Sequence, residues 1–392
     1  MRTLPLVVSI TLAAGLALGL AARASAQSGP DLHAYKAARF VPYVNAGKGP
    51  NAFTDPPKLS FLVQAPGGGA SREFTMTMDT GTTGVVISAT DLPGYSATGY
   101  PQGWEYLSSS KLLWVGHWIP RDLVFQDASG NPLATAKVPV LAVETQYTCP
   151  DWSEKANQPT CAQAQKTVTM PTGIAYMGVG FGREHDGQPQ GTPDKNPLLN
   201  LTTIDGSPIR PGSYRAGYIV TPSGVHVGLS ATNSHDFAWV KLQGRSLDKT
   251  GKPASDDARD WPQASMAVSV NGQLNQSGPV LIDTGIAQMY LTVSDPSQLP
   301  TQPVPNPSRK GAISTGLASG VEVTVSFPDA DSPVSQYRFT VGDNANETAP
   351  SVVLITRGGT PAFVNTGRHL LRDYDVAFDA DGGWFGFRKA VP

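Results

Sequence analysis

The chain has 392 residues, a formal net charge of -2 and 15% charged residues, which gives no electrostatic signature for binding nucleic acid or anionic lipid. Its 41 glycines and 34 prolines, with many short Val, Ile and Thr runs between turn residues, predict a mostly β architecture with long surface loops and exclude a helical bundle. The length allows two domains of ordinary size.

The N-terminus has the pattern of a signal peptide. Arg2 precedes an apolar run at residues 4–22, and Ala24, Ser25 and Ala26 supply the small residues that signal peptidase accepts. We therefore expect cleavage after Ala26 and a secreted or periplasmic protein. A membrane anchor is the alternative, because the run is nearly long enough to span a bilayer, but its two glycines and the cleavage site favour removal.

The following segment, residues 27–57, is polar, and its apolar patch at 40–44 is either a first strand or the remains of a pro-segment. A hairpin follows. One arm is 59–64, three glycines form the turn, and the other arm is the alternating stretch 74–78. The second arm leads directly into Asp79, at the start of a turn-forming Thr-Gly pair.

The same device returns far along the chain. Both Asp79 and Asp283 follow hydrophobic residues and precede Thr-Gly, and the two copies lie about half the mature chain apart. A carboxylate at the tip of a loop between buried strands is costly unless it is hydrogen-bonded or functional. The duplication is the feature that any function for this chain has to explain.

Short apolar runs predict the remaining strands. A Pro-rich loop is expected at 295–311, a loop-rich region at 89–113, a short helix at 196–201 and a helical turn at 370–374. The predicted strands lie at 112–115, 123–125, 138–143, 216–221, 224–229, 237–242, 263–270, 280–283, 321–327, 336–341 and 351–355, with a closing hairpin of 376–379 and 384–387.

Cys149 and Cys161 are the two cysteines of the chain, and after export they predict one disulfide closing a short polar loop, worth about 3 kcal/mol. Redox catalysis would favour a closer C-x-x-C spacing. A glycine-rich string at 178–182 invites a dinucleotide interpretation, but residues 183–189 cannot open a helix. Its glycines are better explained by a backbone that passes close beneath another loop. The six histidines are scattered, so we expect no metal and no cofactor.

Taken together, these motifs resemble the pepsin-like, two-lobed aspartic peptidases over nearly all of the mature sequence, most closely an exported, bacterial-type member without a typical pro-segment. In that family each lobe carries hydrophobic-hydrophobic-Asp-Thr-Gly and, later, a glycine whose backbone crosses the Asp loop. Here Gly178 and Gly367 match the crossing glycines. The segments 367–379 and 384–387 match the closing helix and last strands.

The resemblance implies an all-β fold of two lobes with an active-site cleft between them. The N-terminal lobe would be residues 58–212, with Asp79, and the C-terminal lobe residues 213–392, with Asp283. The chain would be a monomer that binds a polypeptide substrate in this cleft. No nucleic-acid partner is implied, and no membrane contact after signal removal.

The resemblance also implies an aspartic endopeptidase, acting at acidic pH without metal, cofactor or covalent intermediate. Asp79 and Asp283 would share a proton, because two carboxylates around one water cannot both ionise cheaply. The ionised one would take a proton from that water, and its partner would donate to the peptide carbonyl. The residues expected to support the pair are Thr80, Gly81, Thr82, Thr284 and Gly285.

Three departures from the family pattern weaken this expectation. The position after Asp-Thr-Gly is Thr82 in the first copy but Ile286 in the second, so Asp283 loses a hydroxyl donor to its ionised form. The flap is the second departure. Tyr106 is the candidate flap tyrosine, although a buried structural tyrosine is the alternative interpretation of this residue. Asn365 and Thr366 put polar groups beneath Asp283, where they would replace the missing hydroxyl. The alternative function is therefore a catalytically weak or inactive pepsin-fold binding or inhibitor module.

Overall fold

The computed structural model describes residues 29–47, 51–107, 110–152, 158–181, 190–247, 251–308, 311–356 and 358–390. The expected signal peptide, residues 1–26, lies outside these ranges. Within them the protein is all-β, and its helical segments are short 3-10 turns. None of the helices in the described ranges is long and apolar enough to cross a membrane.

The elements follow one another as strands joined by turns and loops. The 3-10 segments are η2 (Pro66–Gly68), η4 (Pro193–Lys195), η5 (Pro296–Gln298) and η6 (His369–Arg372). The strands are β1 (Arg39–Pro42), β2 (Lys58–Gln64), β3 (Ser71–Asp79), β4 (Thr83–Ser88), β5 (Gln102–Leu107), β6 (Leu112–Gln126), β7 (Pro132–Thr148), β8 (Lys166–Thr169), β9 (Ala175–Val179), β10 (Leu201–Ile204), β11 (Ser207–Pro208), β12 (Gly217–Val220), β13 (Gly224–Val227), β14 (Ala238–Lys241), β15 (Ser265–Val270), β16 (Leu274–Leu281), β17 (Met289–Thr292), β18 (Thr301–Pro305), β19 (Ile313–Leu317), β20 (Glu322–Phe327), β21 (Ser335–Thr340), β22 (Val353–Ile355), β23 (Phe363–Asn365), β24 (Tyr374–Asp379) and β25 (Trp384–Lys389).

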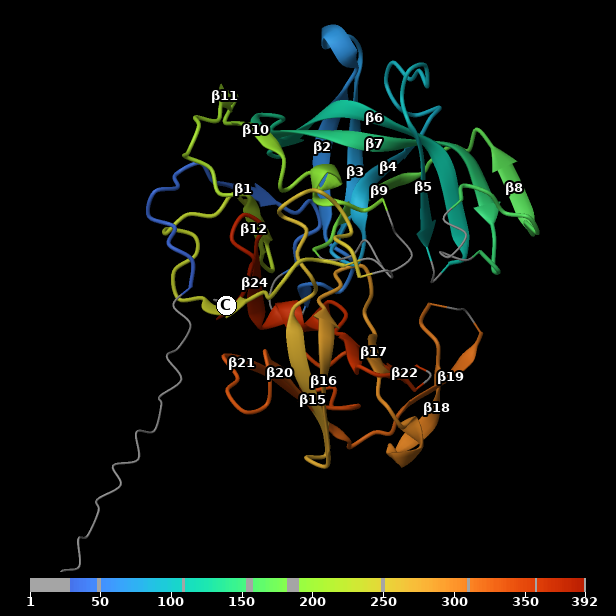
Figure 1. Ribbon diagram of the computed structural model, residues 1–392, viewed down its shortest axis with the longest axis vertical. Coiled ribbons are helices and arrows are strands. Elements are labelled where there is room, and N and C mark those ends of the chain that lie inside the picture. Colours follow the sequence, from blue (N-terminus) through green and yellow to red (C-terminus); the bar gives the residue numbers. More distant parts are fainter. Residues whose placement is uncertain are drawn as a thin grey trace, which may run out of the picture.

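In the described part of the chain these strands form three sheets. A ten-stranded sheet has the order β11-β10-β7-β4-β9-β3-β2-β6-β5, with β8 paired to β7. A nine-stranded sheet has the order β18-β19-β22-β17-β23-β16-β15-β20-β21, and a six-stranded sheet the order β1-β13-β12-β24-β25-β14. Figure 1 shows the ten-stranded sheet in the upper part of the view and the nine-stranded sheet in the lower part, with β12 and β24 between them at one side.

The hairpin before Asp79 forms as its alternation predicts. Phe74, Met76 and Met78 are buried on one face of β3, and β2 pairs with β3 so that Phe61 lies opposite Phe74. The turn contains Gly67 and Gly68, which both have positive φ. Residues with a side chain adopt positive φ only at an energetic cost. Strand β3 is therefore fixed from both sides and places Asp79 at its end.

The two larger sheets repeat one local pairing pattern. In the ten-stranded sheet β9 runs parallel to β3 and antiparallel to β4, and β4 runs parallel to β7. In the nine-stranded sheet β23 runs parallel to β16 and antiparallel to β17, and β17 runs parallel to β22. The two Asp-Thr-Gly segments therefore connect equivalent strands, β3 to β4 and β16 to β17.

The six-stranded sheet joins the beginning and the end of the chain. The first residues of the apolar patch at 40–44 lie in a strand, β1, which pairs antiparallel with β13. Strand β12 pairs with β24, and the rings of Tyr218 and Phe378 stack there with centroids 4.8 Å apart. Arg368 Nε donates to the carbonyl of Phe53 over 2.7 Å, which ties the N-terminal segment to the C-terminal one. The segment is part of the fold.

Four expectations about local structure are wrong. The strands expected at 112–115 and 123–125 are one strand, β6, and the loop-rich region contains β5, which pairs with it. Residues 196–201 form a turn and the start of β10, because Asn196 and Asn200 bond backbone groups with their side chains, which competes with helix formation. The Pro-rich segment contains β18, an edge strand, where prolines are tolerated.

Candidate active site

Asp79 and Asp283 occupy equivalent positions in the two larger sheets. Asp79 is the last residue of β3, and Asp283 lies just past the end of β16. Their exposed fractions are 8% and 7%, so both carboxyl groups are almost fully withdrawn from water. Burial of this degree requires hydrogen-bond partners for both groups.

The threonines of the two motifs exchange hydrogen bonds between the loops. Thr80 Oγ1 donates to the carbonyl of Ile282 over 2.6 Å and accepts from Thr284 N over 3.0 Å. Thr284 Oγ1 donates to the carbonyl of Met78 over 2.6 Å and accepts from Thr80 N over 2.9 Å. The pattern is reciprocal, so the two loops are held face to face in a symmetric arrangement.

The glycines of the motifs bring each loop against the opposite carboxylate. A Cβ atom on Gly81 would lie 2.7 Å from the carboxyl atoms of Asp283, and one on Gly285 would lie 2.5 Å from Asp79 Oδ2. These distances are too short for any side chain, so only glycine fits at either position. The carboxyl groups of the two aspartates, hereafter the aspartate pair, therefore both lie at the contact between the two Asp-Thr-Gly loops.

Each aspartate accepts one backbone and one side-chain hydrogen bond. Gly81 N donates to Asp79 Oδ1 over 2.6 Å, and Gly285 N donates to Asp283 Oδ1 over 2.9 Å. The second oxygen of Asp79 accepts from the hydroxyl of Tyr176, and Asp283 Oδ2 accepts from Asn365 Nδ2 over 2.7 Å. One oxygen of each carboxylate thus faces its own turn, and the other faces a side chain from a neighbouring strand.

The strand register explains why Tyr176 and Asn365 are equivalent. Tyr176 on β9 lies opposite Val86 on β4, and Asn365 on β23 lies opposite Tyr290 on β17. Val86 and Tyr290 stand at the same number of residues after their respective aspartates. Asn365 therefore supplies a polar donor beneath Asp283, as its position suggested. Nothing in the sequence indicated a contact between Tyr176 and Asp79, because a tyrosine before Met-Gly is typical of an apolar strand residue.

The crossing glycines pack against the loops that follow the motifs. A Cβ on Gly178 would lie 2.6 Å from both Thr82 Oγ1 and the backbone nitrogen of Thr83. Gly367 has φ +63°, and a Cβ there would lie 2.5 Å from the carbonyl oxygen of Gln288. Close backbone passage thus requires glycine at both positions.

Thr82 does not take the role that its position suggests. Its Oγ1 is buried and has no hydrogen-bond partner of good geometry among the described residues. The second oxygen of Asp79 instead accepts a hydrogen bond from Tyr176, and that of Asp283 accepts one from Asn365. The absence of a hydroxyl at Ile286 is therefore compensated by a donor from another strand.

Tyr106, the candidate flap residue, lies on the face of the β5–β6 hairpin opposite to the aspartate pair. It is 5% exposed, its ring lies 4.6 Å from that of Trp152, and its hydroxyl donates to the carbonyl of Cys149 over 3.1 Å. The predicted disulfide between Cys149 and Cys161 forms beside it, with S–S 1.98 Å. Tyr106 is thus packed as a structural tyrosine.

The preceding residue of the same strand, Glu105, faces the other way. It lies opposite Trp114 on β6, and the Trp114 ring packs edge-on against Tyr176 with centroids 6.1 Å apart. Burial raises the pKa of Glu105 well above its ordinary value, and the Asp79 carboxylate raises it further. Burial and the same carboxylate raise the pKa of Tyr176. Sequence reasoning missed Glu105, although strand alternation around Tyr106 could have found it.

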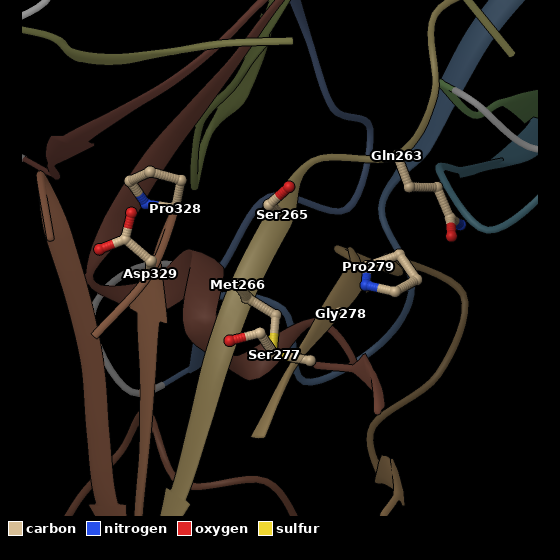
Figure 2. A pocket seen from close by; sticks show the side chains of 8 residues that line it. All are labelled: Gln263, Ser265, Met266, Ser277, Gly278, Pro279, Pro328 and Asp329. Atoms are coloured by element: carbon tan, nitrogen blue, oxygen red, sulfur yellow. The ribbon is translucent and has the colours of Figure 1, made fainter. Parts of the chain in front are cut away.

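A cavity lies away from the aspartate pair. It has a volume of about 560 Å³ and opens beside β15 and β16. Figure 2 shows Pro328 and Asp329 on one side of β15 and Gln263 and Pro279 on the other. Neither aspartate lines it. Among the residues that the structure describes, no group of His, Cys, Asp and Glu side chains has the arrangement of a metal site.

Comparisons with known proteins do not identify the chain. No protein-family model matches it, and no curated protein is similar to it in sequence. Its function has to be argued from the site itself.

Proposed function

We propose that this protein is an aspartic endopeptidase with a pepsin-like fold of two lobes, residues 58–212 and 213–392, and that its active site is the aspartate pair. One observation carries the proposal. Two copies of Asp-Thr-Gly meet through reciprocal threonine hydrogen bonds, with each glycine against the opposite carboxylate. A fold that needed only turn-stabilising aspartates would have no reason to bury two of them against each other.

The chemistry follows from two carboxyl groups that share one proton. The ionised group accepts a proton from a bound water as the water attacks the peptide carbonyl, and the protonated group donates to the carbonyl oxygen. Gly81 N and Gly285 N each hold one oxygen of their own aspartate, while Tyr176 and Asn365 hold the other. These donors fix the orientation of both carboxylates, so the bound water is deprotonated and attacks the peptide carbonyl from a defined direction.

The proposed setting is acidic and extracytoplasmic. The disulfide between Cys149 and Cys161 supports an oxidising compartment, which is consistent with a secreted or periplasmic protein. The proposed substrate is an extended polypeptide in the cleft between the lobes. A pepsin-fold binding module without turnover is the competing function, favoured by Ile286 and by a Thr82 hydroxyl that makes no hydrogen bond of good geometry among the described residues.

The test is peptide hydrolysis by the exported chain between about pH 3 and 7. We expect cleavage of an unfolded protein, inhibition by a statine-type transition-state mimic, and a loss of kcat of about 10²–10⁴-fold or more in Asp79→Asn and in Asp283→Asn. Asp127→Asn is the matched control, because that aspartate lies in an exposed turn. If the purified chain cleaves no member of a peptide library while still binding the mimic, the binding module is the better function.

A further inference from the structure

Glu105 is a buried acid that the proposed mechanism does not use. Its exposed fraction is 3%, and neither of its carboxyl oxygens has a hydrogen-bond partner among the described residues. A buried polar group without a partner is rare in native proteins and calls for an explanation. A carboxyl group in this position is far less costly when it is neutral than when it is charged.

The surroundings of Glu105 connect it to the aspartate pair. Its strand partner Trp114 packs on Tyr176, and Tyr176 donates to Asp79. Val86 and Trp118 complete the apolar cluster on this face of the hairpin. A charge on Glu105 would lie in these apolar surroundings, which makes it costly, and the carboxylate that acts on it is that of Asp79.

Asp79 is the charged group that opposes the ionisation of Glu105. From β3 it faces Asp79, whose charge repels a second negative charge, and from β9 it faces Tyr176, whose pKa the Glu105 charge raises in turn. The residue opposite it on β6 is the uncharged Trp114. Arg368, the N-cap residue of η6, is a buried cation that interacts electrostatically with Asp283, and it donates to the carbonyls of Phe53 and Thr54.

We propose that Glu105 is a third acid of this site, a positioning residue that keeps its proton while the aspartate pair carries its single negative charge. Ionisation of Glu105 would place a second negative charge beside Asp79, so the pair would bind a second proton. The pair would then lose its single negative charge, which ends activity on the alkaline side of the pH profile. The part of this inference that concerns catalysis rests on the proposed function. The part that concerns the proton on Glu105 does not.

The first experiment measures the charge state of Glu105 through stability. If the folded protein keeps the proton and the unfolded chain releases it at the ordinary value of 4.5, the folding equilibrium constant of the wild type falls about tenfold per pH unit above that value, relative to Glu105→Gln. Urea unfolding of both proteins between pH 4 and 7 gives this ratio. Glu73→Gln, an exposed acid on β3, gives the background slope. A ratio that does not change with pH beyond that background overturns the inference.

The second experiment measures the effect on the aspartate pair. In the wild type, loss of a proton from either Glu105 or the pair ends activity. In Glu105→Gln, only loss of the proton from the pair ends activity. We expect the alkaline limb of the kcat/KM profile to move up, by about 0.3 pH unit if Glu105 and the pair lose their protons equally readily. An unchanged limb contradicts the positioning role.

The two experiments separate the two proposals. If no form of the protein cleaves peptides but the stability ratio falls with pH, the proposed function fails while the buried proton stands. If Glu105→Gln does not fold, Glu105→Met, which has a similar volume and no charge, provides the same pH ratio. A flat ratio with active enzyme would leave the peptidase intact and remove Glu105 from it.

Discussion

The reciprocal threonine bonds predict that Thr284→Val is strongly destabilising. Thr284 is fully buried, accepts from Thr80 N over 2.9 Å and donates to the carbonyl of Met78 over 2.6 Å. Valine has nearly the same shape but cannot make either bond, so one buried N–H and one buried C=O lose their partner. Each such group costs about 1–3 kcal/mol, so we expect the free energy of unfolding to fall by about 2–6 kcal/mol. That is a large fraction of the 5–15 kcal/mol of a typical native protein.

Equilibrium urea unfolding of wild type and variant measures this loss, provided that both have the same m-value. The matched control is Thr202→Val, because Thr202 is exposed and its hydroxyl donates to the carbonyl of Thr135 over 3.2 Å. We expect the control to change stability by less than about 0.5 kcal/mol. If Thr284→Val costs no more than Thr202→Val, the hydrogen bonds between the loops contribute nothing to stability and the symmetric contact is incidental.

Two further predictions follow from the same region. Gly285→Ala places a Cβ 2.5 Å from Asp79 Oδ2, so we expect it to abolish peptide cleavage and to lower the thermal midpoint. The control Gly69→Ala, where the nearest atom is 3.4 Å from the new Cβ, leaves cleavage unchanged. An active Gly285→Ala would contradict the described contact. Burial lowers the pKa of His369 from 6.5 to about 4. As the pH drops from about 6.5 to about 4, the unfolded chain binds a proton that the folded protein does not bind, so stability should fall. His369→Gln should reduce this acid-side loss in urea unfolding at pH 7 and pH 4.5, and an unchanged loss would show that His369 is protonated in the folded protein.

The local pattern of the sequence was sufficient for much of the fold. Alternation of apolar residues along β3 and the glycine turn after β2 both occur where the sequence indicates, because they depend on neighbours in the chain. The disulfide was also predictable from two cysteines and an exported chain. The predictions failed at 196–201, where side-chain hydrogen bonds to the backbone override helix formation, and at β18, where an edge position tolerates proline.

The sequence by itself determined that two equivalent carboxylates exist, each at the end of a buried strand and each followed by Thr-Gly. That follows from short-range periodicity and from the repetition of the motif. Only the tertiary structure decided which side chains surround them. Tyr176 reaches Asp79 because of the pairing of β9 with β4, and Asn365 reaches Asp283 because of the pairing of β23 with β17. Likewise, strand alternation puts Glu105 and Tyr106 on opposite faces of β5, but which of these faces meets Tyr176 depends on contacts between residues far apart in sequence.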